Sequence, residues 1–224
     1  MSFFFDGISI QNLRKSNMDS LLLKERNIKG TDVCIAVVCD GIGSLEDGAF
    51  ASSTAVRMLN QWFSGISGLG RLGLQMRDSV LEINAHIVKQ AQDQGLRTGT
   101  TLSALLLTEE EYYVVHTGDS RIYICQDGLL RPLTEDQILD GRLTACLGRG
   151  EKTDLYYNEG GFRSGRFLLC SDGLYKRMEH ETLQAELEHV SPKTMGKTIE
   201  RLIRHVTCRG ERDNISLAVV LKGK

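Results

Sequence analysis

Short strand-like segments that follow one another through tight turns constrain the fold of this chain most strongly. The stretches "LLLTEEEYYVV" and "YICQDGLL" each place two apolar runs on either side of polar turn residues, as β-hairpins do. Strands joined this closely pair antiparallel, because a parallel pair needs a longer crossover connection. Similar segments recur at "FFFDGISI", "SLLLKE", "VCIAVVC", "DLYYNE", "RFLLCS" and "ISLAVVLK". The pattern argues against a doubly wound parallel sheet.

The predicted helices are grouped and do not alternate with the strands. Residues 47 to 63 and 71 to 95 carry apolar side chains at helical spacing, and so do residues 180 to 190 and 193 to 207. Grouped helices beside antiparallel strands predict an α+β fold arranged as a layered sandwich. No linker, internal repeat or low-complexity segment divides the chain, so we expect one domain over residues 1 to 224.

Composition and charge narrow the class of protein. With 27 basic and 29 acidic residues the formal net charge is -2, which gives no field that would draw a nucleic acid or an anionic membrane to the whole surface. No apolar run is long enough for a membrane span, and the apolar start "MSFFF" is too short for a signal peptide. The six cysteines form no C-x-x-C pair and are expected to be buried, reduced thiols. We therefore expect a cytoplasmic protein without a nucleic-acid partner.

Four aspartates lie at the ends of predicted strands. Asp40 ends the apolar run in "VVCDGIGS", Asp119 and Asp172 follow two later strands, and Asp213 directly precedes the last one. An unpaired aspartate is costly to bury, and aspartate with glycine is also an ordinary turn pair. One such pair would indicate only a turn, but four acids at strand ends, three of them next to a glycine, indicate acids held for a ligand.

If these strand ends lie at one edge of the sandwich, the carboxylates converge and repel one another unless a counter-charge is present. Ligands that are oxygen only, without a cluster of histidine or cysteine, suit hard cations such as Mg²⁺ or Mn²⁺. Two such ions side by side are a known device for hydrolysing phosphoesters. Phosphoryl chemistry is therefore the leading class of function.

Six motifs in this sequence resemble, in order, those of the type 2C protein phosphatases, the metal-dependent Ser/Thr phosphatases. They are "RKSNMD" (14 to 19), "VVCDGIGS", "RTGTTLSAL" (97 to 105), "VVHTGDSRIY" (114 to 123), "LLCSDGLY" (168 to 175) and "RDNISLAVV". The resemblance covers nearly the whole chain. It implies a four-layer α-β-β-α sandwich with two central antiparallel sheets and metal ions at one end.

The resemblance also implies a set of metal ligands for two Mn²⁺ or Mg²⁺ ions. Asp40 would bridge the two ions, and the backbone carbonyl of Gly41 would bind one of them. Asp172 and Asp213 would complete the carboxylate ligands of the first ion. Asp19 would act mostly through an ion-bound water.

Three further positions match functional residues of the family. Asp119 matches an acid that helps to hold a third, weaker metal in bacterial relatives. Arg14 matches the arginine that binds the substrate phosphate, for which a charged fork of donors is well suited. Asn214 would orient metal-bound water. The implied activity is hydrolysis of phosphoserine and phosphothreonine by a metal-activated water, with a phosphoprotein substrate of a Ser/Thr kinase and a monomeric enzyme.

Two departures from the family pattern bear on the leaving group and on the substrate cleft. Ile42 stands where some relatives have a histidine proposed to protonate the leaving group. In residues 131 to 148 the segment that normally forms a flap beside the substrate cleft is shortened to about residues 137 to 142, with Gln137 in the place of a histidine. We expect a more open cleft and weaker docking of phosphoproteins.

Two other functions remain open at this point. A relative of the same fold could bind phosphoproteins or regulate a partner without hydrolysis, although such a relative would normally have lost some of the acids. A metal-dependent phosphodiesterase or nuclease is a weaker alternative, because such sites often add histidines and a basic surface, and this chain has five histidines and no strong basic excess.

Overall fold

The computed structural model describes residues 3–223, so residues 1, 2 and 224 of the predicted domain lie outside the described part. Two five-stranded sheets form its centre, and all strand pairs in them are antiparallel. The first sheet has the order β1 (Phe3–Ile10), β12 (Ile215–Lys222), β11 (Arg166–Cys170), β6 (Arg121–Gln126) and β7 (Leu129–Pro132). The second has the order β10 (Tyr156–Gly161), β5 (Glu111–Thr117), β4 (Leu102–Leu107), β3 (Thr31–Cys39) and β2 (Ser20–Ile28).

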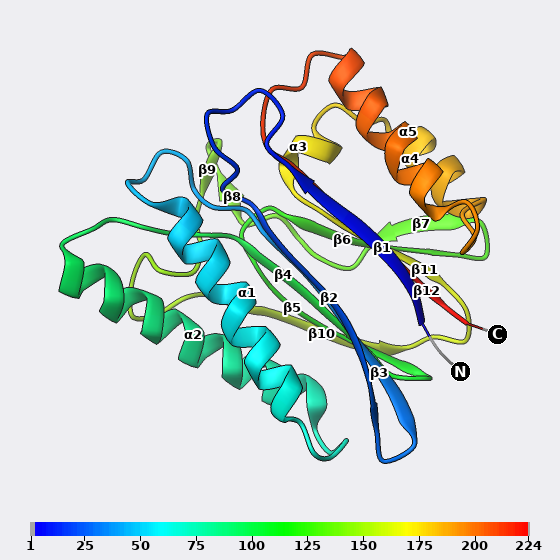
Figure 1. Cartoon of the computed structure of the whole chain (residues 1–224), viewed down its shortest axis with the longest axis horizontal. Coiled ribbons are helices and arrows are strands. Elements are labelled where there is room, and N and C mark those ends of the chain that lie inside the picture. The colour runs from blue at the N-terminus through cyan, green and yellow to red at the C-terminus, as the bar shows by residue number, and fades with distance from the viewer. Residues whose placement is uncertain (1–2, 224) are drawn as a thin grey trace.

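Helices cover the outer face of each sheet (Figure 1). Helices α1 (Gly48–Gly65) and α2 (Leu72–Gln94) pack on the second sheet, and α4 (His180–Glu188) and α5 (Met195–Cys208) pack on the first. A single-turn helix, α3 (Asp172–Tyr175), follows β11. The predicted four-layer α-β-β-α sandwich with two antiparallel sheets is confirmed. Within residues 3–223, no helix combines the length and apolar character needed to cross a membrane.

Strand β3 shows why the run before Asp40 is apolar without interruption. Val33, Ile35 and Val37 face helices α1 and α2, whereas Cys34 and Ala36 face the other sheet. Both faces of this strand are buried, so neither face would expose a polar side chain to solvent. The strand is therefore apolar at successive positions and does not alternate with polar residues. Strand β12 alternates in the same way between the helices and the space between the sheets.

The observed helix limits agree with the predicted ones to within about three residues, and local capping accounts for two of them. The Asp47 carboxylate accepts a hydrogen bond from the backbone N–H of Phe50 at 2.9 Å, which starts α1. Helix α2 ends at Gly95, which has a positive φ of 66° and donates its N–H back to the last turn. Because β3 ends at Cys39 and α1 begins at Gly48, residues 40 to 47 form a loop between them. This loop lies at the end of the sandwich that carries the acids.

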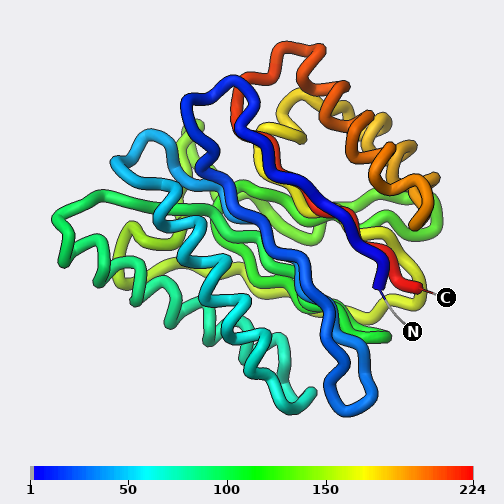
Figure 2. Tube along the Cα trace, in the orientation of Figure 1, coloured from blue at the N-terminus to red at the C-terminus, as the bar shows by residue number. Residues whose placement is uncertain are grey.

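The first and last strands lie side by side (Figure 2). Their register runs from Phe3 opposite Lys222 to Ile10 opposite Ile215. This pairing brings the loop after β1 next to the loop before β12, although about 200 residues separate them in the sequence. Arg14 and Asp213 meet for this reason.

Candidate metal centre and phosphate site

A cavity of about 480 Å³ opens at one end of the sandwich. Loops at the ends of both sheets form most of its wall, with one residue each from α3 and from a short strand of residues 142–143. The lining residues are Leu13, Arg14, Lys15, Ser16, Met18, Asp40, Gly41, Ile42, Gly43, Thr101, Asp119, Leu143, Asp172, Asp213 and Asn214. All the predicted site residues except Asp19 therefore line a single cavity.

Antiparallel topology brings the acids to this end of the molecule. In the second sheet Asp19 precedes β2 and Asp40 follows β3, and these two strands are paired through Ser20 and Cys39. In the first sheet Asp172 follows β11 and Asp213 precedes β12, with Cys170 paired to Leu217. Asp119 lies in the link from β5 to β6, which passes from one sheet to the other. The end of one strand and the start of its antiparallel neighbour necessarily share an edge.

Backbone contacts fix the loop that carries Asp40. The Asp40 N–H donates to the hydroxyl of Thr101 at 2.9 Å, and the Asp40 carbonyl accepts from the backbone N–H of Thr101 at 2.9 Å. The N–H of Gly41 donates to the carbonyl of Met18 at 3.2 Å. A side chain at Gly41 would lie 2.5 Å from the carbonyl oxygen of Gly48. Only glycine allows this close approach between the loop and the start of α1.

Asp19 lies just behind the cavity and is only 8% exposed. Its Oδ2 accepts a hydrogen bond from the Ser171 hydroxyl at 3.0 Å. Burial raises the pKa of Asp19 to about 6, and hydrogen bonds from serine hydroxyls offset only part of this shift. Asp19 therefore holds a proton more readily than an ordinary carboxyl group does.

The pKa values of Asp40 and Asp119 are also raised. Burial raises the pKa of Asp40 well above its usual range, and repulsion from Asp19 and Asp172 adds to the effect. Burial and the charge of Asp172 raise the pKa of Asp119 to about 6. Such shifts mean that the carboxylates are short of positive charge, which is a common property of functional sites.

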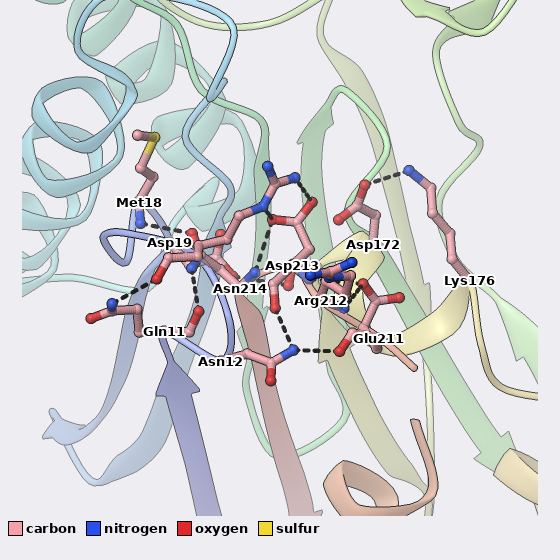
Figure 3. Close-up of polar contacts among 12 residues, drawn as sticks. Gln11, Asn12, Met18, Asp19, Asp172, Lys176, Glu211, Arg212, Asp213 and Asn214 are labelled. Carbon is pink, nitrogen blue, oxygen red and sulfur yellow. Dashed lines mark hydrogen bonds and ion pairs between the residues drawn. The ribbon is translucent and has the colours of Figure 1, made fainter. Parts of the chain in front are cut away.

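Two cations of the chain supply part of this charge. Arg14 binds Asp213 through two parallel hydrogen bonds, from Nε to Oδ1 at 2.7 Å and from Nη2 to Oδ2 at 2.5 Å. Lys176, one turn beyond the start of α3, forms an ion pair with Oδ2 of Asp172 (Figure 3). Lys176 was not predicted as a site residue, although its position four residues after Asp172 is the spacing of a helical ion pair.

Asn214 makes hydrogen bonds to the backbone with both ends of its amide (Figure 3). Its Oδ1 accepts from the N–H of Met18 at 2.9 Å, and its Nδ2 donates to the carbonyls of Gln11 and Ser16 at 2.9 and 3.0 Å. These contacts tie the loop between β1 and β2 to the start of β12. Asn214 therefore positions the loop that carries Arg14 and Asp19, and its role in orienting metal-bound water stays a prediction.

The donor set fits divalent cations in the inner part of the cavity. Buried Oδ1 atoms of Asp19 and Asp172 have no hydrogen-bond partner, so two oxygens are available for a ligand. Oxygen ligands of this kind suit Mg²⁺ and Mn²⁺. Among residues 3–223, no three His, Cys, Asp or Glu side chains are already grouped closely enough to hold an ion. Asp172 can offer Oδ1 to an ion while Oδ2 stays with Lys176, whereas both oxygens of Asp213 accept from Arg14.

Residues 138–143, in the segment where the sequence predicts a shortened flap, form a small hairpin at the cavity rim. Strands β8 (Ile138–Leu139) and β9 (Arg142–Leu143) pair with each other. The turn that joins them consists of Asp140 and Gly141, which both have positive φ. An Asp-Gly pair between apolar residues is a strong hairpin signal, although this hairpin was not among the predicted ones. Of the hairpin residues, Leu143 lines the cavity. Gln137 joins the hairpin to the loop after β5, because its Oε1 accepts from the N–H of Gly118 at 2.8 Å.

Comparison with known proteins agrees with this geometry. The family described as Protein phosphatase 2C matches residues 15–213. Serine/threonine phosphatase stp of Listeria monocytogenes is 28% identical over 214 residues, which cover 83% of each chain. The chain belongs to the protein phosphatase 2C family.

Solved structures share the fold over almost the whole chain. The catalytic domain of the serine threonine protein phosphatase PstP, in complex with two manganese ions, is 27% identical, with a TM-score of 0.84 over 98% of this chain and 97% of that one. Serine/threonine phosphatase Stp1 from Staphylococcus aureus has a TM-score of 0.88 at 18% identity, covering 98% of this chain and 95% of that one. The second similarity concerns the fold alone.

Proposed function

We propose that this chain is a Mn²⁺- or Mg²⁺-dependent phosphatase that hydrolyses phosphoserine and phosphothreonine in proteins. One observation carries the proposal: acids from both sheets and Arg14 converge on a single cavity. The relatives named serine/threonine phosphatases and the manganese ions of the PstP catalytic domain support it.

Each residue has a distinct part in the proposed reaction. Asp40, Asp172, Asp213 and the carbonyl of Gly41 would hold two divalent ions, with Asp19 behind them. Bound ions of this kind activate a water molecule and neutralise the charge of a transferring phosphoryl group. Arg14 has a side chain that is 58% exposed and a planar fork of donors, so it can turn from Asp213 to the phosphate oxygens.

The leaving group is the serine or threonine oxygen of the substrate. No histidine is among the residues that line the cavity, and Ile42 lies at the position where some relatives have one. We infer that the proton needed by the departing oxygen comes from solvent water. Leu143 and Leu13 form apolar parts of the rim, where the peptide on either side of the phosphorylated residue would lie.

We also propose a cellular setting for the enzyme. It would act as a monomer in the cytoplasm, in signalling, and oppose a Ser/Thr kinase. Five buried free cysteines support a reducing compartment. The apolar layer shared by both sheets supports our proposal that the chain is one catalytic domain, because residues such as Val38 and Phe167 pack there from opposite sides.

Substitution of Asp40 by Asn tests the function. We expect Asp40→Asn to abolish Mn²⁺-dependent hydrolysis of p-nitrophenyl phosphate and of a phosphothreonine peptide, while the fold persists because one repelling charge is removed from the cluster. Asp93→Asn, at an exposed position on α2, is the matched control and should keep full activity. Full turnover by Asp40→Asn, or by the unaltered chain in excess chelator, would contradict the proposal. Faster hydrolysis of bis-p-nitrophenyl phosphate than of the monoester would favour a phosphodiesterase.

A further inference from the structure

Lys176 lies beside the acid cluster, outside the cavity wall, and the proposed mechanism gives it no role. Its ammonium group pairs with Oδ2 of Asp172, and its charge also acts on Asp119 and Asp40. The Asp172 side chain is only 16% exposed, whereas that of Lys176 is 52% exposed, so the lysine reaches inward from the surface. A fixed positive charge therefore lies on the side of the acid cluster where Asp119 and Asp172 influence each other.

The neighbouring residues hold α3, and with it Lys176, in position. The guanidinium of Arg121 stacks 3.7 Å from the ring centroid of Tyr175, the residue before Lys176. Arg121 is itself fixed by two hydrogen bonds to Asp136, from Nε at 2.9 Å and from Nη2 at 2.7 Å. Lys176 is thus attached to a helical turn that these contacts hold in place. The position of its ammonium group does not depend on its flexible side chain alone.

The same contacts occupy several of the oxygens that a third cation near Asp119 would use, although Oδ1 of Asp172 has no partner. Both carboxylate oxygens of Asp136 are held by Arg121, and Oδ2 of Asp172 is held by Lys176. Gln137, the next polar side chain along this loop, accepts from the N–H of Gly118 and donates to the carbonyl of Asp154. Divalent cations need several oxygen ligands, and a nearby ammonium repels them.

We propose that Lys176 takes the place of a third metal ion beside Asp119 and Asp172, so that this chain binds two divalent cations and supplies the third positive charge itself. The inference rests on the proposed function. It is an alternative to the expected weaker third site at Asp119, argued from residues that fit an internal cation better than a metal.

Calorimetric titration with Mn²⁺ tests the inference without any assay of activity. We expect two ions per unaltered chain and two for Lys176→Arg, which keeps the charge. We expect one more ion for Lys176→Met, and loss of that extra ion in the double variant Lys176→Met with Asp119→Asn. Lys193→Met, which removes an exposed lysine that does not line the cavity, is the matched control and should stay at two.

Two results would overturn the inference: an ion bound to the unaltered chain that Asp119→Asn alone removes, or no additional ion in Lys176→Met. Because the Lys176 side chain is exposed, the variant should fold, and a thermal melt equal to that of the unaltered chain checks this. If the unaltered chain binds no Mn²⁺ at all, the proposed function fails, and the inference fails with it. A chain that binds Mn²⁺ but in another stoichiometry contradicts the inference alone, whereas a chain that binds none contradicts the proposed function as well.

Discussion

Arg14 and Asp213 form a two-point ion pair although 199 positions separate them in the sequence. The pair joins the proposed phosphate-binding side chain to a proposed metal ligand. Burial alone would raise the pKa of Asp213, but the hydrogen bonds and charge of Arg14 reverse the shift and hold the pKa below its usual range. Asp213 is therefore ionised over the working range of pH, and it competes with the substrate phosphate for the same guanidinium.

The first prediction concerns Arg14→Ala. We expect kcat/KM for a phosphothreonine peptide to fall by roughly 10- to 100-fold, the effect of losing a charged hydrogen-bond partner. Affinity for Mn²⁺ should not fall, because Asp213 loses the cation that competes with the metal. Steady-state kinetics and calorimetry measure the two effects. A parallel loss of Mn²⁺ affinity would show that Arg14 supports the metal ligands instead.

A second prediction compares two glycines of the same loop. In Gly41→Ala the added Cβ would lie 2.5 Å from the Gly48 carbonyl oxygen and 2.6 Å from the Met18 carbonyl oxygen, so the backbone must move. We expect Gly41→Ala to lose most activity and Mn²⁺ affinity. Gly43→Ala is the control, since its nearest contact is the Met18 sulfur at 3.7 Å. Equal activity of the two variants would show that the loop is not held as described.

A third prediction concerns stability and pH in the presence of a chelator. Asp19 and Asp119 each have a pKa of about 6 in the folded chain, raised above the ordinary value of 3.8 chiefly by burial. The folded state thus keeps protons that the unfolded state releases, so stability is highest below about pH 4 for these groups and falls as the pH rises through about 6. Each group accounts for at most about 3 kcal/mol.

Thermal melts at pH 5 and pH 7.5 measure this effect. With chelator we expect a lower Tm at pH 7.5, and with Mn²⁺ we expect the larger stabilisation at pH 7.5, where the carboxylates are ionised. Asp19→Asn should weaken the dependence on pH. A chelated protein that is more stable at pH 7.5 than at pH 5 would argue against strained acids in the cavity.

A fourth prediction concerns the hairpin of β8 and β9. Leu143→Ala removes an apolar contact from the cavity rim, so we expect KM for a phosphopeptide to rise by a few-fold, as for loss of part of a buried side chain. Hydrolysis of p-nitrophenyl phosphate should change little, because that substrate has no flanking peptide. Leu139→Ala is the control, since Leu139 is 66% exposed and does not line the cavity. Equal effects on both substrates would place Leu143 outside peptide recognition.

Local patterns were sufficient to predict most of the fold. Strand β3 is apolar throughout and the hairpin of β4 and β5 has a short polar turn, so both follow from neighbouring residues alone. The gathering of acids was also predictable, because antiparallel pairing of β2 with β3 puts Asp19 and Asp40 at one edge. The metal-binding roles of these acids remain predictions.

The contacts of the charged side chains were not predictable to the same degree. Nothing near Arg14 in the sequence indicates Asp213 as its partner, since the pairing depends on β1 lying next to β12. The hydrogen bonds of Asn214 to Gln11 and Ser16 also span about 200 positions and were not predicted, whereas its water-orienting role came from the family resemblance and stays a prediction. Lys176 was missed because α3 has one turn, which is too short for a periodic pattern.

The place of β12 in the first sheet has a consequence for biosynthesis. This strand lies between β1 and β11, and Asp213 enters the cavity just before it. A ribosome must therefore make nearly all of the described sequence before β1 gains its neighbour and the acid cluster gains its last member. An emerging chain cannot assemble the cavity early, so the proposed hydrolase would stay inactive until its final strand is in place.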